Sequence, residues 1–234
     1  MSTRMTAAPP PLAFGTFKLR GDELRQALHT ALAVGYRHID TATCYRNEEV
    51  VGEVLQDEIG SGRLTREDVF ITSKLAPKEQ GYEQARAAVL GSLERLQLEY
   101  IDLYLIHWPG VAGLRREDPG NQEPRRHSWR ALEELQGEGK VRHIGVSNYT
   151  VRHLQELLQR CHVPPFLNQV ECHPLCQQRE LRDYCHQHNI LLECDPARIK
   201  ANFQVPPTLT EDELEQLDAL DQNHHLCWDP TLVP

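Results

Sequence analysis

Four side chains whose types work together in proton transfer follow apolar segments of this chain: Asp40, Tyr45, Lys74 and His107. A phenol with its ordinary pKa of about 10 gives up a proton slowly at neutral pH. A nearby ammonium group stabilises the phenolate and lowers that pKa, and a carboxylate paired with the ammonium group holds it in place. An imidazole can hydrogen-bond a substrate oxygen and orient it toward the phenol. We therefore predict a site that protonates an oxygen atom as it gains negative charge.

Each of the four residues also has an ordinary structural explanation. Asp40 could cap a helix or pair with a cation, Lys74 could be solvated, and His107 and Tyr45 could pack in the interior. Their shared position favours the chemical explanation, because each follows a predicted strand directly or within a few residues. In parallel α/β folds, functional groups collect at that end of the strands.

The elements that must position these residues alternate between strand-like and helix-like patterns. Apolar strand-like runs cover residues 12–17, 36–39, 69–73, 101–106, 143–146, 167–170 and 190–192. Helical periodicity covers residues 22–34, 48–59, 82–96, 128–135, 151–161, 180–188 and 211–220, with Asn47 as a candidate cap for the second helix. The period of about thirty to forty residues indicates β-α units and a parallel sheet.

So many β-α units in one chain favour a barrel of the (β/α)8 TIM type over an open doubly wound sheet. A closed barrel needs eight strands and about 250 residues, so we expect an incomplete barrel of about seven strands. One domain is predicted over residues 12–234, including a C-terminal tail, after a disordered lead-in at 1–11. A polar loop at 111–127 follows the fourth strand, on the side where substrates usually enter.

Composition narrows the choice of partner. The net charge of -9 argues against nucleic acid and anionic membranes, and the apolar runs are too short for a membrane span or a signal core. The 7 cysteines are scattered and contain no C-x-x-C, which is typical of reduced thiols in the cytoplasm. Cys172, His173, Cys176, His186 and His188 could be considered as zinc ligands, but their spacing matches no usual structural zinc site, so we predict no metal. A small-molecule substrate is therefore expected.

A reaction in which the substrate oxygen gains negative charge needs a source of electrons as well as a proton donor. No nucleophilic Ser-His pair and no metal cage accompanies it in the sequence, so a hydride from a nicotinamide is the simplest complement. The glycines do not form G-x-G-x-x-G, and we therefore expect the dinucleotide to bind at the mouth of a barrel and not on a Rossmann unit.

Three motifs make the chain resemble the aldo-keto reductase family, in particular its prostaglandin F synthase and diketogluconate reductase-like branch. The first is Gly-Tyr-Arg-His-Ile-Asp-Thr-Ala-x-x-Tyr at 35–45, followed by Glu48, Glu49, Val51 and Gly52. The others are Leu-Tyr-Leu-Ile-His-Trp-Pro at 103–109 and Gly-Lys-Val-Arg-His-Ile-Gly-Val-Ser-Asn-Tyr at 139–149.

The resemblance implies an oxidoreductase that reduces aldehydes and ketones with NADPH. It implies that Tyr45 donates the proton, that Lys74 and Asp40 tune it, and that His107 orients the carbonyl group. The cofactor-binding residues that it implies are Gly15, Thr16 and Phe17 beneath the cofactor, Ser147, Asn148 and Gln169 at the carboxamide, and Arg198 and Asn202 at the adenosine. Trp108 would line the substrate pocket.

The chain departs from the family pattern after the seventh strand. The family's Ala-Tyr-Ser-Pro-Leu-like run, whose tyrosine stacks on the nicotinamide, is replaced by Ile-Leu-Leu-Glu-Cys-Asp-Pro at 190–196. The adenosine-binding segment follows at once, without the eighth strand and the Ile-Pro-Lys-Ser run that grips the 2'-phosphate. We expect the chemical residues to be intact, but barrel closure and cofactor affinity to be impaired, with unpaired strand edges that favour self-association.

Two other classes of function remain open. One is a pseudoenzyme or truncated isoform that acts as a nucleotide-binding or interaction protein, which the missing strand favours. The other is a metal-dependent barrel hydrolase, for which only His107 and Asp40 lie at suitable strand ends.

Overall fold

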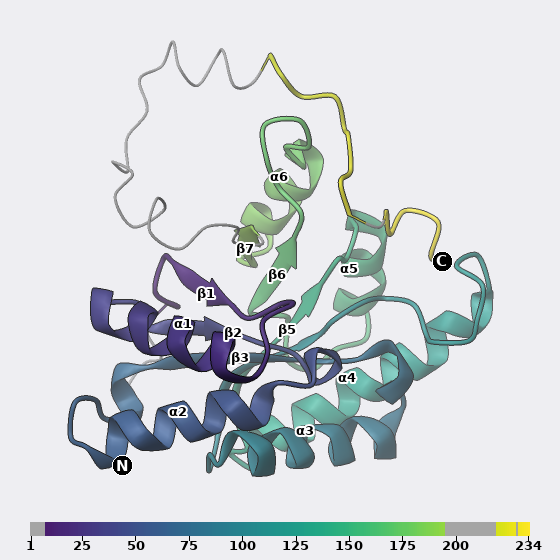
Figure 1. Ribbon diagram of the computed structural model, residues 1–234. Helices are drawn as coiled ribbons and strands as arrows, with labels where there is room; N and C mark the ends of the chain where they lie inside the picture. The colour runs from purple at the N-terminus through teal and green to yellow at the C-terminus, as the bar shows by residue number, and fades with distance from the viewer. Residues whose placement is uncertain (1–7, 195–218, 228) are drawn as a thin grey trace.

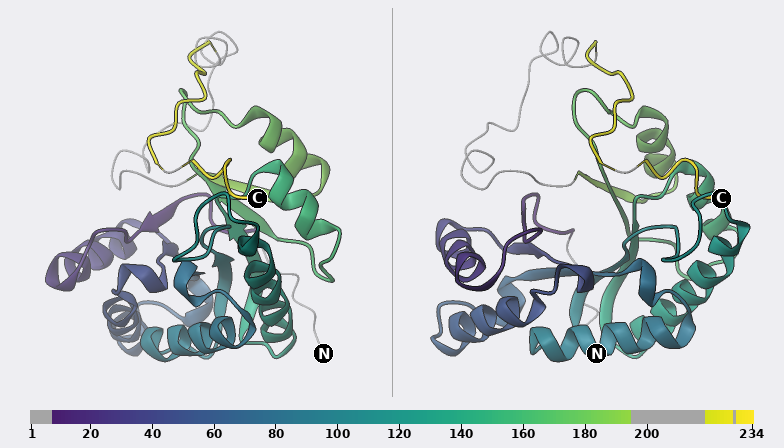
Figure 2. Two further views of the ribbon diagram at one scale, coloured as in Figure 1. Left: turned by 90° about the vertical axis from the view of Figure 1, so that its right-hand side faces the viewer. Right: turned by 45° about the vertical axis from the view of Figure 1, so that its right-hand side comes forward.

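Seven parallel strands form one sheet in the order β1-β2-β3-β4-β5-β6-β7. The computed structural model describes residues 8–194, 219–227 and 229–234. The sheet curls, and the helices cover its outer side, as Figures 1 and 2 show. The strands are β1 (Ala13–Gly15), β2 (His38–Asp40), β3 (Phe70–Leu75), β4 (Ile101–Ile106), β5 (Val141–Ser147), β6 (Leu167–Val170) and β7 (Leu191–Cys194). Each lies within or beside a predicted run, so the α/β barrel type is confirmed.

The helices return the chain from the end of one strand to the start of the next. They are α1 (Gly21–Val34), α2 (Glu48–Gly60), α3 (Tyr82–Leu96), α4 (Gln122–Gly137), α5 (Val151–Leu158) and α6 (Arg179–Gln187). Short 3-10 turns are η1 (Thr43–Tyr45), η2 (Arg66–Asp68), η3 (Pro77–Glu79) and η4 (Pro119–Asn121). Most of the predicted helix at 211–220 lies outside the described residues, as do residues 1–7 of the predicted lead-in.

The core has two parts because successive strand residues point to opposite faces of the sheet. Tyr104 and Ile106 of β4 belong to the large cluster that lies between sheet and helices. Leu103 and Leu105 join Leu167 in a small cluster on the other face, inside the curl. Every residue of β4 is buried, which explains why its sequence is mostly apolar and not alternating; the buried Asp102 is paired with Arg66 at 2.6 Å.

The barrel is open. Within the described part of the chain, β1 pairs only with β2, β7 pairs only with β6, and no pairing joins the two edges. The expected incomplete barrel is therefore confirmed for these residues. Self-association through the edges stays a prediction. No helix in the described part is long and apolar enough to cross a bilayer.

Two local predictions were wrong. The polar loop at 111–127 is shorter than expected because α4 begins at Gln122. The helix can include Pro124 because this residue lies in the first turn, where a backbone N–H has no partner within the helix. Asn47 precedes α2 without capping it through its side chain. Its amide instead donates to the carbonyl oxygens of Thr16 and Leu19, both at 3.0 Å, and accepts from the Thr41 hydroxyl at 2.9 Å. Asn47 thus ties the loop after β1 to the loop after β2.

Candidate active site

A buried ion pair forms the base of the site. Asp40 ends β2 and is 2% exposed; Lys74 lies near the end of the neighbouring β3 and is 1% exposed. The Lys74 ammonium group donates to Oδ1 of Asp40 and, at 3.1 Å, to the carbonyl oxygen of Thr41. Oδ2 of Asp40 accepts a hydrogen bond of 2.9 Å from Nε2 of Gln169 on β6. Both carboxylate oxygens therefore have a partner in the interior, as a buried charge requires.

Tyr45 lies above this pair in the turn η1, which follows β2. Nζ of Lys74 is 5.3 Å from the centroid of the Tyr45 ring. The rings of Tyr45 and His107 meet edge to face, with centroids 5.7 Å apart and planes at 79°. Phe17, from the loop after β1, lies on the ring with a centroid distance of 5.1 Å. The structure thus brings Asp40, Tyr45, Lys74 and His107 together, as the sequence predicts.

His107 follows β4 and is held from two sides. Its carbonyl oxygen accepts a 2.9 Å hydrogen bond from the Asn148 side chain, and Nδ1 of its ring lies 3.5 Å from Sγ of Cys44. Burial and the charge of Lys74 together lower the pKa of His107 to about 3, against the opposing charge of Asp40. The imidazole is therefore neutral at physiological pH, with one nitrogen donating and the other accepting.

The predicted carboxamide-binding residues form a second polar set at the ends of β5 and β6. Ser147 donates from its hydroxyl to the carbonyl oxygen of Gln169 at 2.9 Å. Asn148 donates from its side chain to the Ser147 hydroxyl at 3.1 Å, and its backbone has a left-handed φ of 61°. Because Gln169 also binds Asp40, this set is continuous with Asp40, Tyr45, Lys74 and His107.

The other predicted residues lie around these two sets. Gly15 ends β1, and Thr16 donates from its hydroxyl and its backbone N–H to the carbonyl oxygen of Asp40, at 3.1 and 2.9 Å. Phe17, in the loop after β1, is 61% exposed. Trp108 is half-buried beside His107. Arg198 and Asn202 lie outside the described residues.

Two residues at the site were missed from the sequence. Gln80 donates from Nε2 to the carbonyl oxygens of Trp108 and Gly110, both at 2.8 Å, and so holds the loop after β4. Nothing in the local sequence indicates this, because Gln80 lies in a different β-α unit. Cys44 was placed only among scattered thiols, although its position next to Tyr45 was a usable signal.

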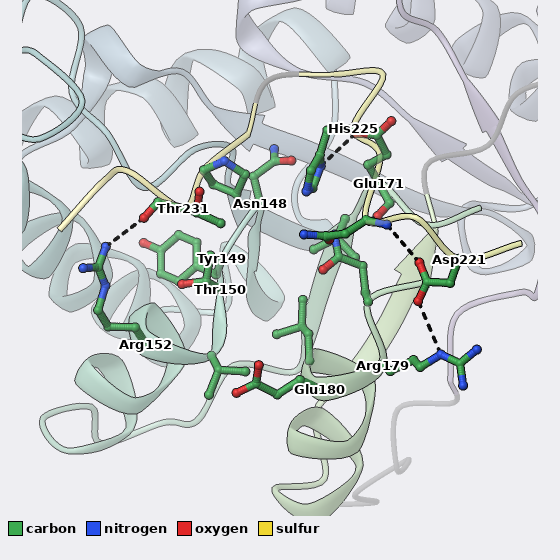
Figure 3. Close-up of a pocket in the computed structure, with 16 residues that line it drawn as sticks. Asn148, Tyr149, Thr150, Arg152, Glu171, Arg179, Glu180, Asp221, His225 and Thr231 are labelled. Atoms are coloured by element: carbon green, nitrogen blue, oxygen red, sulfur yellow. Dashed lines mark hydrogen bonds and ion pairs between the residues drawn. The ribbon is translucent and has the colours of Figure 1, made fainter. Parts of the chain in front are cut away.

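A cavity of about 530 Å³ lies beside Asn148 of the predicted carboxamide-binding set (Figure 3). Asn148 lines one side, and the start of α6 and the C-terminal segment line another. Arg179 and Asp221 form an ion pair at 3.3 Å on its wall, and His225 binds Glu171 at 3.3 Å. Among the described residues, no group of three or more histidines, cysteines and carboxylates is arranged to hold a metal ion.

Comparison with known proteins assigns this chain to a family. The model of the aldo/keto reductase family matches residues 11–194. Glyoxal reductase of Bacillus subtilis (strain 168) is 48% identical over 185 residues, and 9,11-endoperoxide prostaglandin H2 reductase of Trypanosoma cruzi (strain CL Brener) is 47% identical over 184 residues. These matches cover 79% and 78% of this chain and 62% and 60% of the relatives. The chain thus spans less than two thirds of the length of both.

Solved structures agree with the fold. An aldo-keto reductase enzyme, MGS-M4, from a Medee basin deep-sea metagenome library superposes with a TM-score of 0.84 at 32% identity, covering 95% of each chain. A second aldo-keto reductase, AKR2E5 complexed with NADPH, gives a TM-score of 0.83 at 25% identity, covering 92% of this chain and 85% of that one. With the three motifs, the curled parallel sheet and the clustered Tyr45 site, these matches show that the chain belongs to the aldo/keto reductase family.

Proposed function

We propose that this protein reduces aldehydes or ketones to alcohols with NADPH, and that Tyr45 donates the proton. The observation that carries the proposal is the contact of Tyr45 with both the Lys74 ammonium group and the His107 ring, above a carboxylate that anchors the lysine. A family of reductases and a relative named as a glyoxal reductase support the same reaction class.

The residues at the ends of β5 and β6 suit the nicotinamide end of the cofactor. Ser147, Asn148 and Gln169 carry a hydroxyl group and two amides. The Ser147 hydroxyl and the Asn148 NH2 group already donate within the protein, so the amide oxygens of Asn148 and Gln169 are the groups that would accept from a carboxamide. NADPH bound there supplies the hydride. A solved neighbour contains NADPH, which supports the choice of cofactor.

The chain's own residues divide the proton chemistry among them. The neutral His107 ring donates a hydrogen bond to the substrate carbonyl oxygen and orients it. Tyr45 gives its hydroxyl proton to that oxygen as negative charge develops, and the ammonium group of Lys74 stabilises the resulting phenolate. Asp40 holds Lys74 in place, and Gln169 holds Asp40.

A second candidate is a nucleotide-binding or interaction protein without turnover. The open sheet favours it: β1 and β7 leave a gap in the described part of the barrel mouth, where a closed barrel would surround the cofactor. In that case the cofactor binds weakly, and the predicted catalytic residues no longer catalyse a reaction. A cytoplasmic location is expected for either candidate from the reduced thiols, and it stays a prediction.

Titration with NADPH, followed by cofactor fluorescence and with NADH for comparison, separates the two candidates. Saturable binding together with NADPH oxidation in the presence of glyoxal or other simple aldehydes supports the reductase. The Tyr45→Phe variant should then lose at least about 100-fold in turnover, because general acid catalysis contributes roughly 10²–10⁴-fold. Its NADPH affinity should stay unchanged. If the variant turns over normally, Tyr45 is not the proton donor. If the wild type binds NADPH but does not oxidise it, a nucleotide-binding role is favoured; if it does not bind NADPH either, the interaction protein is the alternative that remains.

A further inference from the structure

We propose that Cys44 is a positioning residue that sets the tautomer of His107 and so determines which ring nitrogen can donate to the substrate. The proposal rests on the proposed function, in which His107 orients the carbonyl group. It assigns a role to the side chain directly before Tyr45, where the three motifs specify no residue type.

The contact is specific. Cys44 lies in the turn η1, and its sulfur is 3.5 Å from Nδ1 of His107, within range of a hydrogen bond to sulfur. The backbone carbonyl of His107 is held separately by the Asn148 side chain. Cys44 therefore affects where the ring proton lies and not the path of the backbone.

The protonation states of both groups determine the direction of the hydrogen bond. Burial lowers the pKa of His107 to about 3, so the ring carries one proton. Desolvation around the sulfur raises the pKa of the Cys44 thiol, although part of the residue is exposed, so the thiol keeps its proton. A neutral thiol is a poor acceptor and an imidazole nitrogen a good one. The S–H group therefore donates to Nδ1, which places the ring proton on Nε2.

This placement matters for the reaction. A ring with its proton on Nε2 presents a donor to a carbonyl oxygen through that nitrogen, whereas the other tautomer presents a lone pair that repels the same oxygen. Without the thiol, both tautomers become populated and only part of the protein is competent. The apparent affinity for the substrate is then reduced in proportion to the fraction of protein that is competent. From the usual net worth of one hydrogen bond, we expect a loss of about two- to tenfold in kcat/KM.

Three variants test the proposal. Cys44→Ala removes the donor, and Cys44→Ser keeps a hydroxyl donor at the same position. Cys161→Ala removes a half-buried thiol in the turn after α5, away from the site, and is the matched control. The ¹⁵N chemical shifts of the His107 ring report the tautomer directly and need no substrate.

We expect the Nε2–H tautomer in the wild type, in Cys44→Ser and in the control, and a mixture in Cys44→Ala, with a lower kcat/KM and unchanged NADPH affinity. A wild-type ring protonated on Nδ1, or a Cys44→Ala ring that keeps one tautomer on Nε2, would overturn the proposal. If the wild type shows no reductase activity, the proposed function fails, but the chemical shifts still decide whether Cys44 sets the tautomer.

Discussion

Replacing Lys74 with methionine should destabilise the protein by leaving the Asp40 carboxylate in the interior with one partner. Lys74 and Asp40 are 1% and 2% exposed, so water cannot take the place of the lost ammonium group without opening the site. Oδ1 of Asp40 loses Nζ, while Oδ2 keeps the Gln169 amide at 2.9 Å. The Thr41 carbonyl oxygen also loses its 3.1 Å hydrogen bond from Lys74.

Removing one partner of a buried ion pair costs about 3–5 kcal/mol. Because Gln169 still binds Asp40, we place Lys74→Met at about 3 kcal/mol, a large share of the roughly 5–15 kcal/mol that stabilises a typical domain. Removing both charges should cost less than the two single changes together. Replacement of a whole buried pair by apolar side chains is often neutral, whereas each single variant leaves an unpaired charge.

The assay is urea unfolding of the wild type, Lys74→Met, Asp40→Leu and the double variant, which form a double-mutant cycle. We expect a coupling free energy of about 2–4 kcal/mol between the two side chains. The Gln169 amide is left unpaired in both variants that lack Asp40, so its cost cancels in the cycle. Additive effects, or a loss below about 1 kcal/mol in Lys74→Met, would refute the view that the two charges depend on each other in the fold.

Two further changes test packing and protonation. Gly52→Ala should lower the free energy of unfolding by about 1–3 kcal/mol in the same assay, because a Cβ atom on α2 would lie 2.5 Å from the carbonyl oxygen of Arg95 on α3. Gly60→Ala is the control, since a Cβ atom there meets nothing within 4 Å. An equal loss in the control would contradict the packing argument. Burial lowers the pKa of His153 to about 4, below its unfolded value of about 6.5, so the unfolded chain takes up the proton first as the pH falls. Stability from this residue is therefore complete above about pH 6.5 and decreases toward pH 4 with a slope of up to about 1.4 kcal/mol per pH unit. His153→Gln should flatten that slope in urea midpoints measured across the range, and an unchanged slope would show that His153 is not responsible.

The members of the proposed catalytic set could be predicted from the sequence because each occupies the same kind of position relative to a strand. Asp40, Lys74 and His107 each lie at or just after the end of a strand, and parallel strands place these ends at one edge of the sheet. The hydrogen bond between Gln169 and Asp40 spans 129 positions in the chain and depends on how far the sheet curls between β2 and β6. No local pattern determines that curl, so this contact could not be predicted.

The sequence by itself determined the order of the elements, the parallel sheet and the residues delivered to its carboxyl edge, because these follow from the periodicity and from rules about strand ends. Only the tertiary structure decided which of those residues touch. It placed the thiol of Cys44 on His107 and turned Asn47 from a helix cap into a tie between two loops. These outcomes depend on distances across the sheet, which the packing of strands and helices sets and which spacing along the chain does not encode.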